Sequence, residues 1–151
     1  MRAAHDFDRT YAADLVARLE AIPPDAVPRW GSMTPQNLPG HFARMLAVAC
    51  GEAGAVTDQS TWVARRVIKP LLLHGILRIP RNVKAPAALS ADSGERLTTD
   101  GLAAMLTGYL DRVESGEMVP APHPAFGPMT IDEWARLHVL HFEHHMAQFN
   151  A

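Results

Sequence analysis

The C-terminal segment, residues 131–149, places the strongest constraint on how this 151-residue chain folds. Its apolar and histidine residues recur at helical spacing and, at about 100° per residue, share about a third of the helical circumference. That face comprises Ile131, Trp134, Leu137, His138, His141, His145, Gln148 and Phe149. The pattern predicts a helix from Thr130 to Phe149 whose buried face carries histidines. The fold must then supply partners for the buried imidazole nitrogens.

His141 and His145 are four residues apart, so their rings project from the same helical face about one turn from each other. Two imidazoles at this spacing can share a metal ion. A zinc-protease motif would need a glutamate directly after the first histidine, where this chain has Phe142. His144 falls at the margin of the face. We therefore interpret the pair as half of a metal site; the alternatives are buried neutral histidines and a purification tag.

His41 is the candidate for a third ligand. It lies within a second apolar stripe at helical spacing, formed by Leu38, His41, Phe42, Met45, Val48 and Ala49. Three histidines would leave coordination positions open, unlike a structural zinc site with four protein ligands. The expected ion is zinc or nickel, and the catalytic group would be a metal-bound water or thiol. His138 could be a fourth contact, a partner behind the ligands or a proton shuttle.

Four main helices are expected, joined by proline-rich loops, because no window shows sustained strand alternation. The first runs from Phe7 to Ile22 with Asp6 as its cap, and the second begins at Thr34 or near Asn37 and ends about Gly51. The third carries the stripe Leu102, Met105, Leu106, Tyr109, Leu110 and Val113 and ends at Gly116, and the last runs from Thr130 to Phe149. We expect an all-α fold with one domain, residues 1–151, built as a four-helix bundle.

A basic segment separates the second and third of these helices. Residues 62–79 should be helical, with breaks at Pro70 and Gly75. No acidic residue occurs between Gln59 and Ala91, whereas six basic residues do: Arg65, Arg66, Lys69, Arg78, Arg81 and Lys84. Such a block is usually a solvated face. Its functional interpretations are, in order, recruitment of an anionic substrate, a protein interface and a membrane surface.

Composition limits the partners and the compartment. The net charge is −2, so the chain has no overall attraction for nucleic acid. Charged residues interrupt the apolar stretch around residue 70, which excludes a membrane span there. The chain has one cysteine and lacks the apolar segment of a signal peptide near Met1. A cytoplasmic protein is therefore expected, with a small-molecule substrate and without nucleic-acid or membrane partners.

Several of these motifs together resemble the DinB/YfiT-like superfamily of metal-dependent helical bundles, and within it an uncharacterised bacterial branch. The similarity rests on Met33-Thr34-Pro35 leading to His41, on the loop His123-Pro124-Ala125-Phe126-Gly127, and on the ending Leu137-His138 through Gln148-Phe149. By position, the resemblance implies His41, His141 and His145 as ligands of a divalent metal. The family often continues its last ligand with Arg-Gly-Gln, whereas this chain has Met146-Ala147-Gln148 and so keeps the glutamine without the arginine.

The resemblance also implies a range of activities, because relatives include bacillithiol transferases, mycothiol-dependent isomerases and hydrolases. A low-molecular-weight thiol is then an attractive co-substrate, and a homodimer is expected because the family often pairs. The expected function is that of a metal-dependent transferase or hydrolase. The alternative is a non-catalytic helical binding or stress-associated module with a structural metal site.

Overall fold

The computed structural model describes residues 6–54, 56–81 and 96–151. Over these ranges the chain is all-helical and has no strand; its only β-type feature is an isolated bridge between His123 and Gly127. The elements are α1 (Arg9–Ala21), α2 (Leu38–Ala49), the π-helical segment η1 (Ala64–Ile68), α3 (Lys69–Leu73), α4 (Thr99–Ser115) and α5 (Ile131–Ala147). The predicted all-α class is confirmed.

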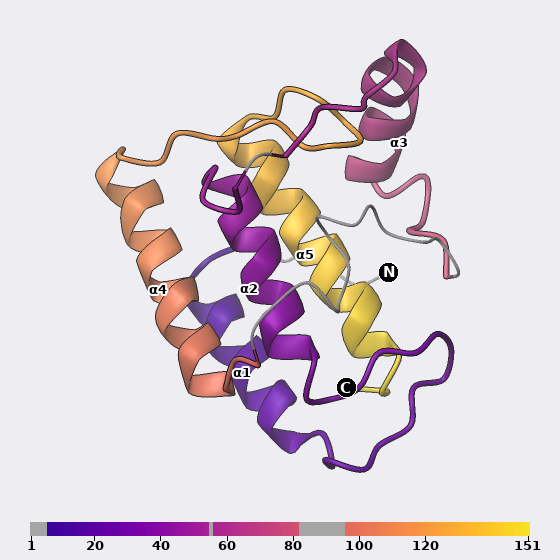
Figure 1. Cartoon of the computed structure of the whole chain (residues 1–151), viewed down its shortest axis with the longest axis vertical. Coiled ribbons are helices and arrows are strands. Elements are labelled where there is room, and N and C mark those ends of the chain that lie inside the picture. The colour runs from indigo at the N-terminus through magenta and orange to yellow at the C-terminus, as the bar shows by residue number, and fades with distance from the viewer. Residues whose placement is uncertain (1–5, 55, 82–95) are drawn as a thin grey trace.

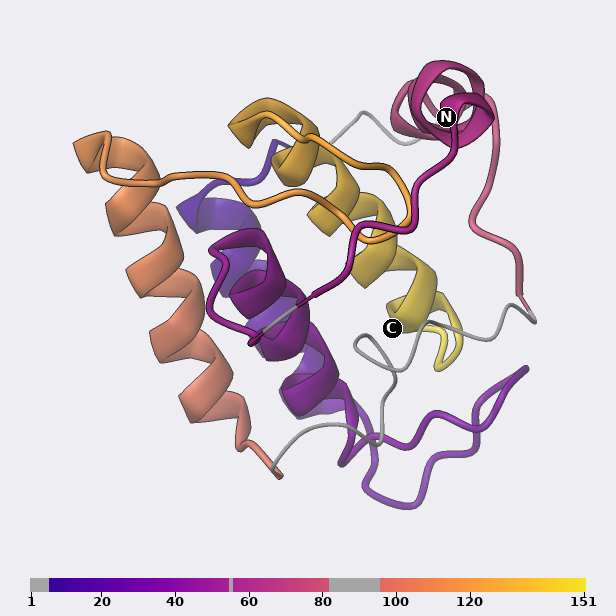
Figure 2. The same cartoon turned by 45° about the horizontal axis from the view of Figure 1, so that its top comes forward.

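The four longer helices lie side by side, and the short α3 projects to one side near the start of α5 (Figures 1 and 2). Helix α4 packs against both α1 and α2, while α5 packs against α2 and α3. Helices α2 and α5 run in opposite directions (Figure 1). The start of α2 therefore lies beside the end of α5, which is the arrangement that the histidine positions require.

The core is formed by one face of each long helix. Its fully buried side chains include Leu15, Leu38, Phe42, Leu46, Leu102, Leu106, Trp134, Phe142 and Met146. Burial of each such side chain contributes about 1.5–3 kcal/mol. The predicted stripe of α4 is wrong at Met105, which is exposed, because the helix packs with the face that carries Leu102, Leu106 and Tyr109.

The helix ends follow local capping chemistry. Helix α1 is capped by Asp8, whose side chain accepts a hydrogen bond from the Tyr11 backbone N–H at 2.8 Å, so the predicted cap at Asp6 is wrong. Helix α2 begins at the later of its two predicted starts, after Asn37. Pro39 then falls in the first turn, where a missing N–H removes no helical hydrogen bond.

Helix α5 has the most strongly specified start. Thr130 and Glu133 form the predicted capping box: the Thr130 hydroxyl accepts from the Glu133 N–H at 3.1 Å, and the Glu133 carboxylate accepts from the Thr130 N–H at 3.0 Å. The Trp134 indole N–H donates to the Ala121 carbonyl at 2.8 Å and ties the preceding loop to the helix. Both interactions fix the position of the helix that carries two of the three candidate ligands.

The basic segment is helical in part. Helix α3 ends before Gly75, which adopts a left-handed φ of 74°. The π-helical turn ends at Ile68, two residues before Pro70, which has no N–H to continue the α-helical pattern. Of the basic side chains, Arg65 pairs with Asp58 at 2.9 Å and Lys69 pairs with Glu133 at 3.3 Å. Lys84 lies outside the described residues.

In the described ranges, no helix combines the length and apolar character needed to cross a lipid bilayer.

Replacing Thr130 by alanine removes one half of the capping box and should lower the free energy of unfolding by about 1 kcal/mol. Chemical denaturation followed by circular dichroism measures the change. Thr107→Ala is the matched control, because Thr107 is exposed in the middle of α4, where alanine favours the helix. Equal stability of the Thr130 variant and the unmodified protein would show that the capping box does not stabilise the start of α5.

Candidate metal centre

Three histidines from two antiparallel helices meet at one point. His41 comes from the first turn of α2, and His141 and His145 from the last two turns of α5. The Nε2 atom of His41 lies 2.9 Å from that of His141 and 3.0 Å from that of His145, and the latter two are 3.1 Å apart. The structure thus brings together the three predicted residues in a group that could hold a metal ion.

Hydrogen bonds alone cannot satisfy this triangle. The Nε2 atom of a neutral imidazole carries either a proton or a lone pair. Among three such atoms in mutual contact, at least two must be alike, and the contact between two protons or two lone pairs is repulsive. A cation that accepts all three lone pairs removes the repulsion. The geometry is therefore compatible with a set of metal ligands.

Gln148 fixes the protonation pattern of His145. Its Oε1 atom lies 2.7 Å from His145 Nδ1, and its amide nitrogen donates to the Trp30 carbonyl at 2.9 Å. Because the amide nitrogen is used by Trp30, the oxygen faces His145 and accepts its Nδ1 proton. The Nε2 atom of His145 then carries a lone pair directed at the other two histidines.

A glycine in the loop before α2 makes room for this link. Gly31 has a left-handed φ of 71°, and a Cβ atom there would lie 3.1 Å from the Gln148 amide nitrogen. The Arg29 N–H also donates to the Gln148 carbonyl at 2.7 Å. The sequence placed Gln148 on the buried face of the last helix but gave no sign that the Trp30 loop would hold it.

Burial keeps these imidazoles neutral. Desolvation, with a smaller contribution from His145, lowers the pKa of His41 to about 3. Desolvation also lowers the pKa of His145 to about 4, and the pKa of His141 falls well below its ordinary value for the same reason, assisted by His41 and His145. Neutral imidazole is the form that binds a metal, so burial prepares all three side chains for coordination.

The spacing of the three nitrogens suits a divalent ion. A point can lie about 2.1 Å from each of three nitrogens that are 2.9, 3.0 and 3.1 Å apart. The three histidines would hold such an ion through Nε2, and imidazole nitrogen is a ligand that both zinc and nickel accept.

The three histidines differ in whether their Nδ1 atoms have hydrogen-bond partners. The Nδ1 atoms of His41 and His141 are buried and have no hydrogen-bond partner among the described residues. An unpaired buried polar atom costs free energy, whereas a ligand imidazole normally donates its second N–H. His145, with its Gln148 acceptor, is thus the ligand whose ring orientation is best defined.

His138 lies outside the three-histidine group. Its ring is fully buried and stacks between Trp134 at 5.5 Å and Phe142 at 5.6 Å. Neither of its nitrogens has a hydrogen-bond partner in the described part of the chain, and burial lowers its pKa to about 3. The role predicted for His138 behind the ligands or as a proton shuttle stays a prediction.

The other two neighbouring histidines have packing roles. His144 is half-buried and meets the rings of His145 at 5.2 Å and Trp30 at 5.7 Å, both edge-on. His123 accepts hydrogen bonds at Nδ1 from the backbone of Ala125 and Phe126, so it closes the loop that leads to α5. Neither belongs to the candidate ligand set.

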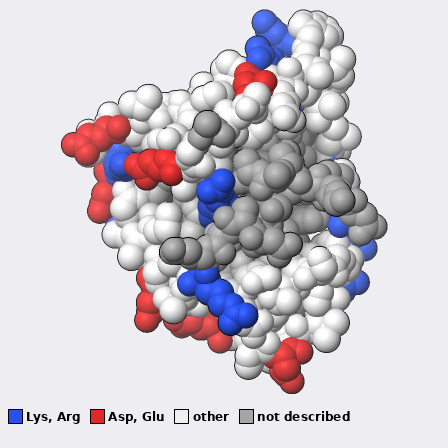
Figure 3. Space-filling model, in the orientation of Figure 1, with Lys and Arg blue, Asp and Glu red and all other residues white. Residues whose placement is uncertain are grey.

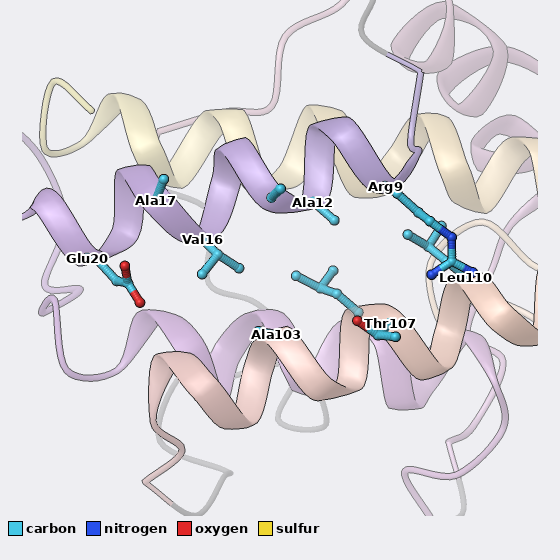
Figure 4. Close-up of a pocket in the computed structure, with 10 residues that line it drawn as sticks. Arg9, Ala12, Val16, Ala17, Glu20, Ala103, Thr107 and Leu110 are labelled. Atoms are coloured by element: carbon cyan, nitrogen blue, oxygen red, sulfur yellow. The ribbon is translucent and has the colours of Figure 1, made fainter.

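A separate groove of about 470 Å³ lies between α1 and α4 (Figure 4). Small side chains such as Ala12, Ala17 and Ala103 form part of its walls. Arg9, at one end, is already paired with Glu114 at 2.8 Å. None of the three histidines lines this groove, so we do not assign it a role in metal chemistry.

The described part of the chain is thus a helical protein with a cluster of three histidines that could bind a metal ion. Residues 41–151 match the model of the family DUF1569, described as a protein of unknown function, and the chain belongs to that family. The matched region begins at His41 and contains His141 and His145. Neither a curated protein nor a solved structure matches the chain.

Replacing Gln148 by leucine should weaken divalent-metal affinity about 10- to 100-fold, because His145 loses the acceptor that orients its ring. Gln148→Glu keeps an acceptor oxygen and should retain most of the affinity. Competition titration with a chromophoric chelator measures both. Gln59→Leu, at an exposed position, is the matched control; a loss as large in the control would contradict the role of Gln148.

His138 should make the metal-free protein sensitive to acid. An unfolded chain takes up this proton near pH 6.5, but the folded protein resists protonation until about pH 3. The free energy of unfolding therefore falls as the pH drops from 7 towards 4, by up to about 1.4 kcal/mol per pH unit for this histidine.

His138→Phe should remove that contribution to the slope, as measured by urea denaturation at a series of pH values. Phe142→Leu alters the same aromatic stack without a titrating group and should shift stability equally at every pH. An unchanged slope in the phenylalanine variant would show that the pKa of His138 is the same in the folded and unfolded chains, which would contradict the effect of burial on this ring.

Proposed function

We propose that this protein is a divalent-metal-dependent enzyme that acts on a small molecule, with His41, His141 and His145 as the metal ligands. The reaction class is transfer to or from a low-molecular-weight thiol, or hydrolysis. The observation that carries the proposal is the mutual contact of the three Nε2 atoms at 2.9–3.1 Å.

A metal ion held by three protein ligands would keep at least one coordination position open for water or substrate. A divalent ion at such a site acts as a Lewis acid and makes a bound water or thiol more acidic near neutral pH. Two features of the chain prepare the histidines for a metal. Gln148 keeps His145 in the tautomer whose Nε2 carries a lone pair. The buried face of α2 limits the access of water to His41, which is only 6% exposed. His141 and His145 are partly exposed, which supports access for a small molecule.

The arrangement of the helices supports a relationship to the DinB/YfiT-like bundles. Two antiparallel helices supply one histidine and a pair four residues apart, in the chain order that the resemblance implies. Between α2 and α4 lies the basic helical segment with η1 and α3, which we propose as an addition to that bundle.

Zinc and nickel are the proposed ions, since imidazole binds both.

Protein expressed without a histidine tag and supplied with zinc or nickel should contain about one ion per chain by elemental analysis. The double variant His41→Ala, His145→Ala should contain almost none. His144→Ala is the matched control, because His144 neighbours His145 but lies outside the ligand triangle.

The cobalt-substituted protein distinguishes an enzyme site from a structural one. A small thiol should change the cobalt absorption spectrum if a coordination position is open. A metal that raises thermal stability but never responds to a thiol or a hydrolysable ester would support the structural module. If the His41→Ala, His145→Ala variant kept its metal, neither an enzyme site nor a structural site could be assigned to the three histidines.

A further inference from the structure

We propose that the guanidinium of Arg81, stacked on Trp30, binds an anionic group, a carboxylate or a phosphate, on the small molecule that reaches the three-histidine cluster. This inference rests on the proposed function and adds to it the charge of the substrate and a residue that selects it. It also assigns a role to one member of the basic segment.

Arg81 is placed beside the metal site by aromatic contacts. Its Cζ atom lies 4.4 Å from the centre of the Trp30 ring. Trp30 in turn meets His144 at 5.7 Å, and His144 meets the candidate ligand His145 at 5.2 Å. Three successive contacts therefore join the guanidinium to the ligand cluster.

Stacking positions the guanidinium without using its hydrogen-bond donors. A guanidinium above an indole ring is held by the attraction between the cation and the π electrons, while its N–H groups point outward in the plane of the fork. Those N–H groups suit two oxygens of a carboxylate or phosphate. Within the described ranges, Arg81 is exposed and forms no ion pair that would occupy them.

Arg29 adds a second positive charge on the same ring. Its Cζ atom lies 5.9 Å from the Trp30 ring centre, and it too has no carboxylate partner among the described residues. The Trp30 indole N–H is buried without a hydrogen-bond partner in that part of the chain. The two guanidinium groups on the Trp30 ring create a positive electrostatic potential that no carboxylate among the described residues neutralises.

The other described members of the basic segment are used or placed differently. Arg65 is paired with Asp58, and Lys69 with Glu133. Arg66 and Arg78 are exposed and have no ring contact with Trp30. In Figure 3, many of the Asp and Glu side chains lie along the edge where α4 lies, and Lys and Arg side chains are spread over several parts of this face, including the edge where the chain continues after α3.

The test uses matched thiols on the cobalt-substituted full chain. One series is ω-mercaptocarboxylates of three to six carbons, and the other is the ω-mercaptoalcohols of equal length. The dissociation constant of each is taken from the thiolate-to-cobalt absorption band. At low salt, the unmodified protein should bind the best carboxylate about fivefold more tightly than its alcohol.

Arg81→Gln should abolish that preference and leave binding of the alcohol unchanged, whereas Arg78→Gln should retain it. Both positions are exposed, so both variants should fold, and circular dichroism checks this. Equal binding of acid and alcohol by the unmodified protein, or equal loss in both variants, would overturn the role of Arg81 and leave the proposed function standing. The absence of a thiolate band with every ligand would overturn the thiol-dependent form of the proposed function, and this inference with it.

Discussion

The contact among three imidazole nitrogens is the constraint on which the rest of the account depends. Burial keeps the three rings neutral, and three neutral Nε2 atoms within 3.1 Å of one another cannot pair their protons and lone pairs without a repulsive contact. A cation at the centre of the triangle turns this conflict into coordination. The helices that hold the rings must resist separation until such an ion is bound.

That resistance comes from the antiparallel packing of α2 and α5 and from the loop that precedes α2. The Trp30 carbonyl accepts a hydrogen bond from Gln148, and Gln148 accepts one from His145, so two hydrogen bonds connect the loop before α2 to the end of α5. The same Trp30 carries Arg81 on its ring. One loop residue thus links ligand orientation to the positive charge that we assign to substrate selection.

The sequence predicted what depends on local periodicity. Histidines four apart on a helix share a face wherever that helix packs, so His141 and His145 could be paired without knowing the fold. His41 was found as a buried-face histidine, but its meeting with the pair depends on the antiparallel arrangement, which spacing alone does not determine. The Trp30 loop escaped prediction because irregular backbone conformations follow from tertiary contacts. The cap of α1 is a different case: Asp8 accepts a local hydrogen bond from the Tyr11 N–H, and the prediction of Asp6 missed the start of the helix by two residues.

X-ray absorption spectroscopy of the metal-loaded, untagged protein tests the central claim most directly. The account predicts three imidazole ligands at about 2.0–2.1 Å and at least one further light-atom ligand that an added thiol replaces. Fewer than three imidazoles, or a closed shell of four protein ligands that no thiol changes, would contradict it.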